Sequence, residues 1–150
     1  MNPARTVRVN LEDGSTFERQ VPQLPIVLPN GWITVFSGEE VHVELTIAEG
    51  GKVTRARAVP KPNRRNPAIS FRLGQKPGGA QSELAVTSYL PRNLKYNLGV
   101  MLTTGGDVVA TSSCPVQAGL RAHETWPQPV FQVVIRDLTF LAEDAPLTCR

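Results

Sequence analysis

Two histidines and a few neighbouring carboxylates are the side chains with which this chain could do acid–base or metal chemistry. His123 and Glu124 are adjacent, and Thr125, Trp126 and Pro127 follow them. The second histidine of a zinc-binding His-Glu-x-x-His helix is therefore missing, and the prolines forbid that helix. A small hydrolase that uses His123 and Glu124 is an alternative hypothesis, which requires both side chains to converge in a pocket with a third polar group.

Other catalytic and cofactor patterns are missing from the sequence. It contains no Gly-x-Ser-x-Gly elbow, no Gly-x-Gly-x-x-Gly and no Walker spacing. The carboxylate pairs Glu39-Glu40 and Glu143-Asp144 are adjacent, and adjacent residues of a strand point to opposite faces. His42 falls on the polar face of an expected strand, where histidines are usually solvated. We therefore expect a protein without catalytic residues, metal or cofactor.

The two cysteines predict a disulfide bond. Cys114 and Cys149 are the only cysteines, and they form no Cys-x-x-Cys pair. A bridge would hold a C-terminal tail that otherwise frays and, by closing a loop of about 35 residues, would stabilise the fold by roughly 3–4 kcal/mol. Disulfides persist in oxidising compartments. We expect a periplasmic or secreted protein whose leader is absent from this sequence; the alternative is a cytoplasmic protein with two buried thiols.

Positive charge is concentrated in one part of the chain. The formal net charge is only +3, yet residues 50–82 hold eight of the 16 Lys and Arg residues and no Asp or Glu. Within this stretch, Lys61, Arg64 and Arg65 fall in an expected loop. They are candidates for binding an acidic protein partner or an anionic envelope component. Nucleic acid is the least favoured ligand, because only Phe71 interleaves with the basic residues.

A second candidate surface is the proline-stiffened segment 118–130. It contains His123 and Trp126, and tryptophan is frequent among the residues that dominate binding energy. The competing interpretation is that Trp126 closes one end of the fold's core. Trp32, which follows an Asn-Gly turn signal, is expected in the core or at its rim.

The apolar pattern has a period of two, which is typical of strands. Residues 6–11 and 16–21 predict a hairpin with the loop Asp13-Gly14-Ser15, which would pair Leu11 with Phe17 and Val7 with Val21. Residues 22–29 hold three prolines and predict an edge or connecting segment, followed by a strand at 32–36.

The clearest pattern lies at residues 41–59. A two-residue turn at Gly50-Gly51 would pair Glu49 with Lys52, Leu45 with Ala56, and Glu44 with Arg57. Apolar partners then share one face of the hairpin and opposite charges share the other.

The second half of the chain predicts further short strands. They are expected at 68–73 and 82–90, in a hairpin of 95–103 with 107–113, and at 130–141 with a bulge near Arg136-Asp137. Residues 115–129 show no obvious element.

These patterns favour a single all-β domain over residues 1–150. We expect an antiparallel, Ig-like β-sandwich, with a closed β-barrel as the alternative. No apolar run is long enough for a membrane helix. We expect a non-enzymatic extracytoplasmic binding or accessory module that acts through surface loops. A structural or inhibitor subunit that pairs through edge strands is the other alternative.

Overall fold

The computed structural model describes residues 2–62 and 68–149, and its regular elements are strands apart from one short 3₁₀ turn, η1 (Glu49–Gly51). The strands are β1 (Arg5–Asn10), β2 (Thr16–Val21), β3 (Ile33–Phe36), β4 (Glu40–Ile47), β5 (Val53–Ala58), β6 (Ile69–Gln75), β7 (Ser82–Ser88), β8 (Leu94–Leu102), β9 (Val109–Thr111), β10 (Arg121–Trp126) and β11 (Val130–Phe140).

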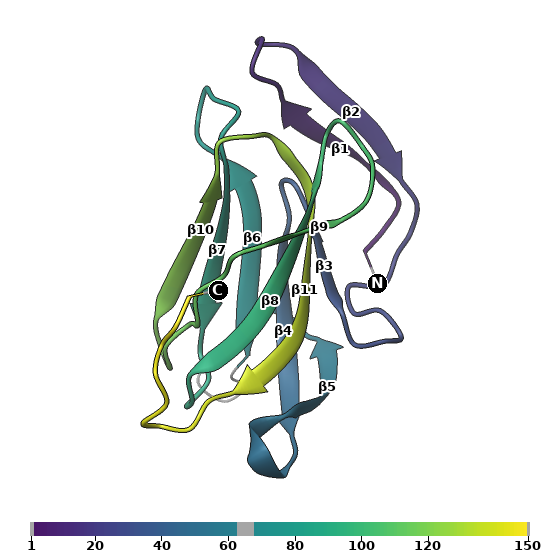
Figure 1. Cartoon of the computed structure of the whole chain (residues 1–150). Coiled ribbons are helices and arrows are strands. Elements are labelled where there is room, and N and C mark those ends of the chain that lie inside the picture. Colours follow the sequence, from purple (N-terminus) through teal and green to yellow (C-terminus); the bar gives the residue numbers. More distant parts are fainter. Residues whose placement is uncertain (1, 63–67, 150) are drawn as a thin grey trace.

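Two antiparallel sheets form the body of the molecule (Figure 1). One sheet has the strand order β10-β7-β6-β4-β5, and the other has the order β3-β11-β8-β9. Among the described residues neither sheet closes on itself, so the architecture is the predicted β-sandwich and not the alternative barrel. Its likeness to immunoglobulin domains stays a prediction.

The main core lies between the two sheets. Most strands of the two sheets alternate apolar side chains that face this core with polar ones that face outward, as the period of two requires, whereas β3 and much of β11 are buried on both faces. Phe71 of β6 meets Tyr96 of β8 edge to face, with ring centroids 6.1 Å apart. This aromatic contact joins the two sheets near the middle of the sandwich.

A separate hairpin of β1 and β2 covers the outer face of the four-stranded sheet at one end (Figure 1). Its apolar face makes a second core with that sheet, in which Phe131 packs edge to face against Phe17 and Phe36. Because the hairpin has a cover for only one of its faces, its other face is polar and exposed.

The predicted register of this first hairpin is wrong. Val9, and not Leu11, lies opposite Phe17, and Val7 lies opposite Arg19. Gly14 ends the loop in the left-handed conformation, and Leu11 bonds to Ser15, so the loop begins one residue earlier than predicted. The error shifts the pairing by two residues. It therefore leaves every side chain on its predicted face.

Glu39 anchors the β1–β2 hairpin to the sandwich. Its carboxylate accepts hydrogen bonds from Asn2 Nδ2 and from the backbone N–H of Phe36, at 2.8 and 2.7 Å, and forms an ion pair with Arg5. Burial raises the pKa of Glu39, while the Phe36 N–H and the Arg5 guanidinium oppose that rise. The guanidinium of Arg5 also lies over the Phe36 ring, 5.2 Å from its centroid.

The β4–β5 hairpin has the predicted pairs Leu45–Ala56 and Glu44–Arg57, but its turn differs from the prediction. Glu49 does not face Lys52. Instead, the N–H of Ala48 donates to the carbonyl of Lys52 around η1, and the register shifts after Thr46. The longer turn brings Gly51 against the end of β11, a contact that only tertiary packing creates.

The structure confirms the remaining strand predictions with one exception. Strands β6, β7, β8 and β9 lie within or beside the predicted stretches, and β11 carries the predicted bulge, with Asp137 at φ 55°. The exception is β10, since residues 115–129 showed no element in the sequence pattern. Prolines flank β10 on both sides, and its inward-facing positions include Glu124, which hides the apolar alternation. No helix long and apolar enough to cross a membrane occurs in 2–62 or 68–149.

Alanine at Gly51 and at Gly50 should separate backbone strain from packing. Both glycines have positive φ, so alanine costs about 1–2 kcal/mol at either position. A Cβ at Gly51 would also overlap the carbonyl oxygen of Phe140, whereas a Cβ at Gly50 meets no described atom. We expect Gly51→Ala to lower the unfolding free energy by about 1–3 kcal/mol more than Gly50→Ala in urea denaturation. Equal losses would contradict this packing.

Candidate functional site

The basic stretch predicted from the sequence divides between strand, turn and loop. Lys52, Arg55 and Arg57 are exposed on or beside β5, and Lys61 is exposed in the loop that follows. The candidates Arg64 and Arg65 lie outside the described residues. These four cations therefore lie along one edge of the five-stranded sheet, because β5 is the last strand of that sheet, whereas Arg72 lies on β6 and Lys76 directly follows it.

The structure does not bring His123 and Glu124 together. Both lie on β10, where His123 pairs across to Ala85 and Glu124 to Leu84, so their side chains point to opposite faces of the sheet. On the outer face, Nδ1 of His123 lies 2.7 Å from the Glu83 carboxylate. On the inner side, Glu124 accepts a hydrogen bond from the backbone N–H of Cys114 at 2.8 Å. The convergence that the hydrolase hypothesis requires is thus not seen.

The two histidines are also too far apart to share a ligand. His42 lies on β4 and His123 on β10, with β6 and β7 between them, which amounts to about 14 Å across the sheet. Nδ1 of His42 lies 2.6 Å from the hydroxyl of Ser70, which is buried. No group of three or more metal-ligating side chains occurs within residues 2–62 and 68–149.

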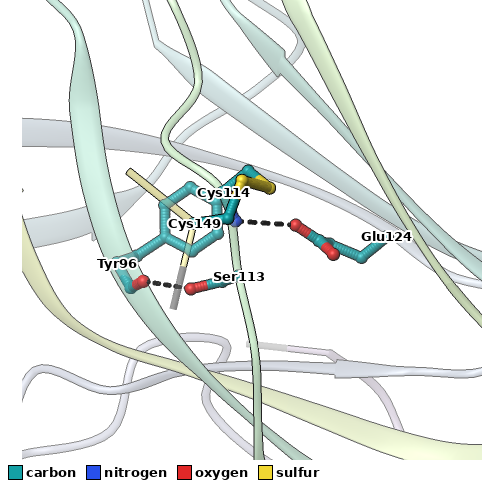
Figure 2. Close-up of a disulfide and its surroundings, with 5 residues drawn as sticks. All are labelled: Tyr96, Ser113, Cys114, Glu124 and Cys149. Atoms are coloured by element: carbon teal, nitrogen blue, oxygen red, sulfur yellow. Dashed lines mark hydrogen bonds between the residues drawn. A yellow bond between two sulfur atoms is a disulfide. The ribbon is translucent and has the colours of Figure 1, made fainter. Parts of the chain in front are cut away.

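The cysteines form the predicted disulfide (Figure 2). Cys114 follows β9 and Cys149 lies in the C-terminal tail, so the bridge ties the tail to an edge of the four-stranded sheet. The Ser113 hydroxyl donates to the Tyr96 carbonyl, and Glu124 accepts from the Cys114 N–H (Figure 2). The disulfide and these two hydrogen bonds therefore fix the C-terminal tail and the segment after β9 against β8 and β10.

Trp126 lies inside the sandwich. Its side chain is only 9% exposed, and its indole Nε1–H donates to the hydroxyl of Thr111 on β9 at 3.1 Å. Together with the hydrogen bond between Glu124 and the Cys114 N–H, this contact links the edge strands β9 and β10, which belong to different sheets. Trp126 therefore occupies the core-closing position that was the competing interpretation, and it offers little surface to a partner.

The ionisable groups near the bridge are affected by burial. Burial raises the pKa of Glu124, and the hydrogen bond from the Cys114 N–H partly opposes this rise. Burial also raises the pKa of Tyr96. This residue is only 1% exposed, and its buried hydroxyl has no hydrogen-bond partner among the described residues. The Glu124 carboxylate adds to that rise, because its negative charge disfavours a phenolate nearby.

A groove runs along the open edge of β5. It has a volume of about 510 Å³, and it lies between β5, the bulge of β11 and the turn that precedes β3. Its lining includes Lys52, Thr54, Arg55 and Ala56 from the β5 side, and Trp32 and Leu138 from the opposite side. The bulge forms this side of the groove, because Asp137 and Leu138 bend away between the regular parts of β11.

Aromatic and positive groups meet at this groove. Trp32 is 36% exposed, and the guanidinium of Arg136 lies over its ring, 5.2 Å from the centroid. Among the described residues, Arg57 pairs with Glu44 at 2.8 Å, but Lys52 and Arg55 take part in no ion pair. The one carboxylate in the lining, Asp137, accepts a hydrogen bond from Asn97. The edge thus presents positive charge beside an accessible indole.

Sequence reasoning placed Trp32 at the core or its rim but did not connect it with the basic stretch. The connection depends on β5 and β11 being neighbours across the sandwich edge, where Lys52 bridges to Thr139. The signal that could have suggested it is the predicted bulge at Arg136-Asp137, because bulges often mark places where a strand turns a side chain toward a site.

The chain matches no known protein family, no curated protein and no solved structure at a significant level. The argument for function therefore depends on the geometry and charge of the chain itself.

Replacing Glu124 by glutamine should change how stability depends on pH. Because burial places the pKa of Glu124 above its ordinary value of 4.5, the folded protein binds more protons than the unfolded chain just above that pH. The wild-type protein therefore loses stability as the pH rises through the folded-state pKa. Glutamine stays neutral and keeps an oxygen that can accept the Cys114 N–H.

We expect the unfolding free energy of Glu124→Gln, relative to wild type, to increase between about pH 4 and pH 7. Chemical denaturation at a series of pH values measures this difference. A difference that stays constant, or falls, over that range would contradict the assignment of a raised pKa to Glu124.

Proposed function

We propose that the protein is a non-enzymatic binding or accessory module that recognises an anionic partner at the groove beside β5. The observation that carries this proposal is the meeting of Lys52 and Arg55, which have no acidic partner in the described part of the chain, with the accessible indole of Trp32. Cations without partners are available to a ligand, and tryptophan is frequent at the centre of binding surfaces.

This proposal moves the binding surface relative to the sequence interpretation. Lys61 remains part of the same basic region, whereas His123 lies on the far edge strand of the sheet and Trp126 is buried. We propose an acidic protein partner or an anionic envelope component as the ligand class. Edge-strand pairing, the alternative role, has its own support in the open edge of β5.

We further propose that the protein works in an oxidising compartment, as a periplasmic or secreted protein. The support is the bridge between Cys114 and Cys149, since disulfides are rare where thiols are kept reduced. The alternative is a cytoplasmic protein in which these two thiols stay reduced.

The compartment can be tested on native protein purified from its own organism, with free thiols alkylated at lysis. We expect a mass lower by the two hydrogens lost in forming the bridge, and no alkylation until a reductant is added. Two alkylated cysteines in the native protein would overturn the proposed compartment.

Charge reversal at the groove should remove binding of anions. We choose poly-L-glutamate and a sulfated oligosaccharide as probes, titrated at low ionic strength where surface charges are least screened. For whichever probe binds the wild-type protein, the double variant Lys52→Glu with Arg55→Glu should have an affinity about tenfold or more lower than wild type. The matched control is Lys76→Glu with Arg121→Glu, which makes the same charge change at exposed positions away from the groove.

The two indoles give a site-specific readout of the same titration. In ¹H–¹⁵N spectra the Nε1–H signal of Trp32 should shift with added probe, while that of the buried Trp126 should stay in place. Equal weakening in both double variants, or a shift of neither indole, would contradict a binding site at this groove.

A further inference from the structure

The free edge of β5 has backbone groups that are ready to pair with another strand. The N–H of Val59 donates to the carbonyl of His42. Hydrogen-bonded pairs recur at every second residue of an antiparallel ladder, so Arg57 and Arg55 also direct their backbone N–H and C=O groups toward β4. Donors and acceptors alternate sides along a strand, so the N–H and C=O of Ala56 and Ala58 point to the open edge. In the described part of the chain, β5 pairs with β4, and beside it only Lys52 bridges to Thr139.

The edge strands β3, β9 and β10 are covered or linked by other parts of the chain. The outer edge of β3 is occupied by the preceding segment, where the carbonyl of Ile26 accepts from Thr34 and Val27 bridges to Ile33. At the opposite side of the sandwich, Trp126 and Glu124 clasp the edges β10 and β9 to each other. An exposed strand edge is a liability unless it is blocked or used, and β5 is the edge that lies beside a groove.

We propose that an extended, acidic polypeptide segment adds to the edge of β5 as a further strand, with its inward side chains in the groove. This inference rests on the proposed function and names the partner class for the same site. In this mode of recognition the main chain supplies the shared hydrogen bonds, and alternate side chains supply the selectivity.

Charge selects an acidic partner over a second copy of this chain. If two β5 strands paired antiparallel about Ala56, Arg55 of each would lie opposite Arg57 of the other, and like charges placed opposite each other are destabilising. A strand with carboxylates on its outward face would instead place opposite charge beside Arg55, which has no ion pair among the described residues, and beside Arg57, which already pairs with Glu44. Lys52, which immediately precedes β5, adds another exposed cation near this edge.

The groove itself selects the inward-facing side chains. Ala56 and the partly buried Val53 lie on its β5 side, and Leu138 and the indole of Trp32 lie across from them. Small or branched apolar side chains fit such a lining. Because β5 spans six residues, or about 20 Å, the expected ligand is a segment of about six residues in which acidic and apolar side chains alternate.

The test uses the whole protein and a six-residue peptide in which glutamate and valine alternate, capped at both ends. Two versions carry backbone N-methyl groups, one on all glutamates and the other on all valines. They keep the same side chains and charge. Successive N–H groups of a strand point to opposite sides, so only one of the two patterns blocks the side that faces β5.

We expect one N-methylated peptide to lose about tenfold or more in affinity and the other to bind within about threefold of the parent peptide. Amide hydrogen exchange supplies a second readout. The amides of Ala56 and Ala58 should become protected when the peptide binds. The amide of Arg57, which already bonds to β4, should change little.

Four results would overturn the inference. Equal affinity of both N-methylated peptides would show that the contact is only electrostatic, and binding of a sulfated oligosaccharide without binding of the peptide would assign the groove to a glycan. Either result leaves the proposed anion-binding function standing. If no anion binds, or if Lys52→Glu with Arg55→Glu weakens nothing, the proposed function and this inference fail together.

Discussion

Burial of both faces of β11 is the constraint on which the rest of the structure depends. Val133 and Ile135 face the main core between the sheets, while Phe131 faces the second core beneath the β1–β2 hairpin. The strand also pairs with β3 on one side and with β8 on the other. A strand that is covered on both faces and both edges leaves little freedom for its neighbours, so the position of β11 determines where both sheets and the added hairpin lie.

The bulge in β11 is the place where this constraint is relaxed. Regular pairing with β8 stops after Arg136 and resumes at Thr139, and Asp137 takes a left-handed conformation between them. Thr139 then meets Lys52 at the start of β5, while Leu138 faces the groove. The bulge therefore lets the two sheets meet at Thr139 and Lys52 but leaves space between them at Asp137 and Leu138, and this space is the groove. It also places Trp32 and Arg136 near the cations of β5.

The two sides of the sandwich manage their edges by different chemistry. At the β9–β10 side, an indole–hydroxyl hydrogen bond, a carboxylate–amide hydrogen bond and the disulfide join strands and tail. At the β5 side, solvent-exposed cations border backbone groups that have no partner in the described part of the chain. Edge charges discourage pairing between identical chains, and they also attract a strand of opposite charge. This asymmetry between a closed side and an open side is the physical basis for assigning binding to β5.

The sequence by itself determined the local features. The period of two predicts strands, and the Gly-Gly pair predicts the β4–β5 hairpin with its partners Leu45 and Ala56. The presence of only two cysteines, one of them in the C-terminal tail, predicts the bridge. These succeed because side-chain alternation and turn chemistry act over a few residues, and because a chain with two cysteines has one possible internal pairing. Even the misplaced register of the first hairpin kept the correct faces, since the slip was an even number of residues.

Tertiary structure alone decided the rest. The apolar alternation did not predict β10, because Glu124 faces inward. Its carboxylate is stabilised there by the N–H of Cys114, which lies in the segment after β9. Burial of Trp126, separation of His123 from Glu124, and the meeting of Trp32 with Arg55 likewise depend on which strands become neighbours. Strand order is set by packing between residues far apart in the chain, and no local pattern of residues encodes it.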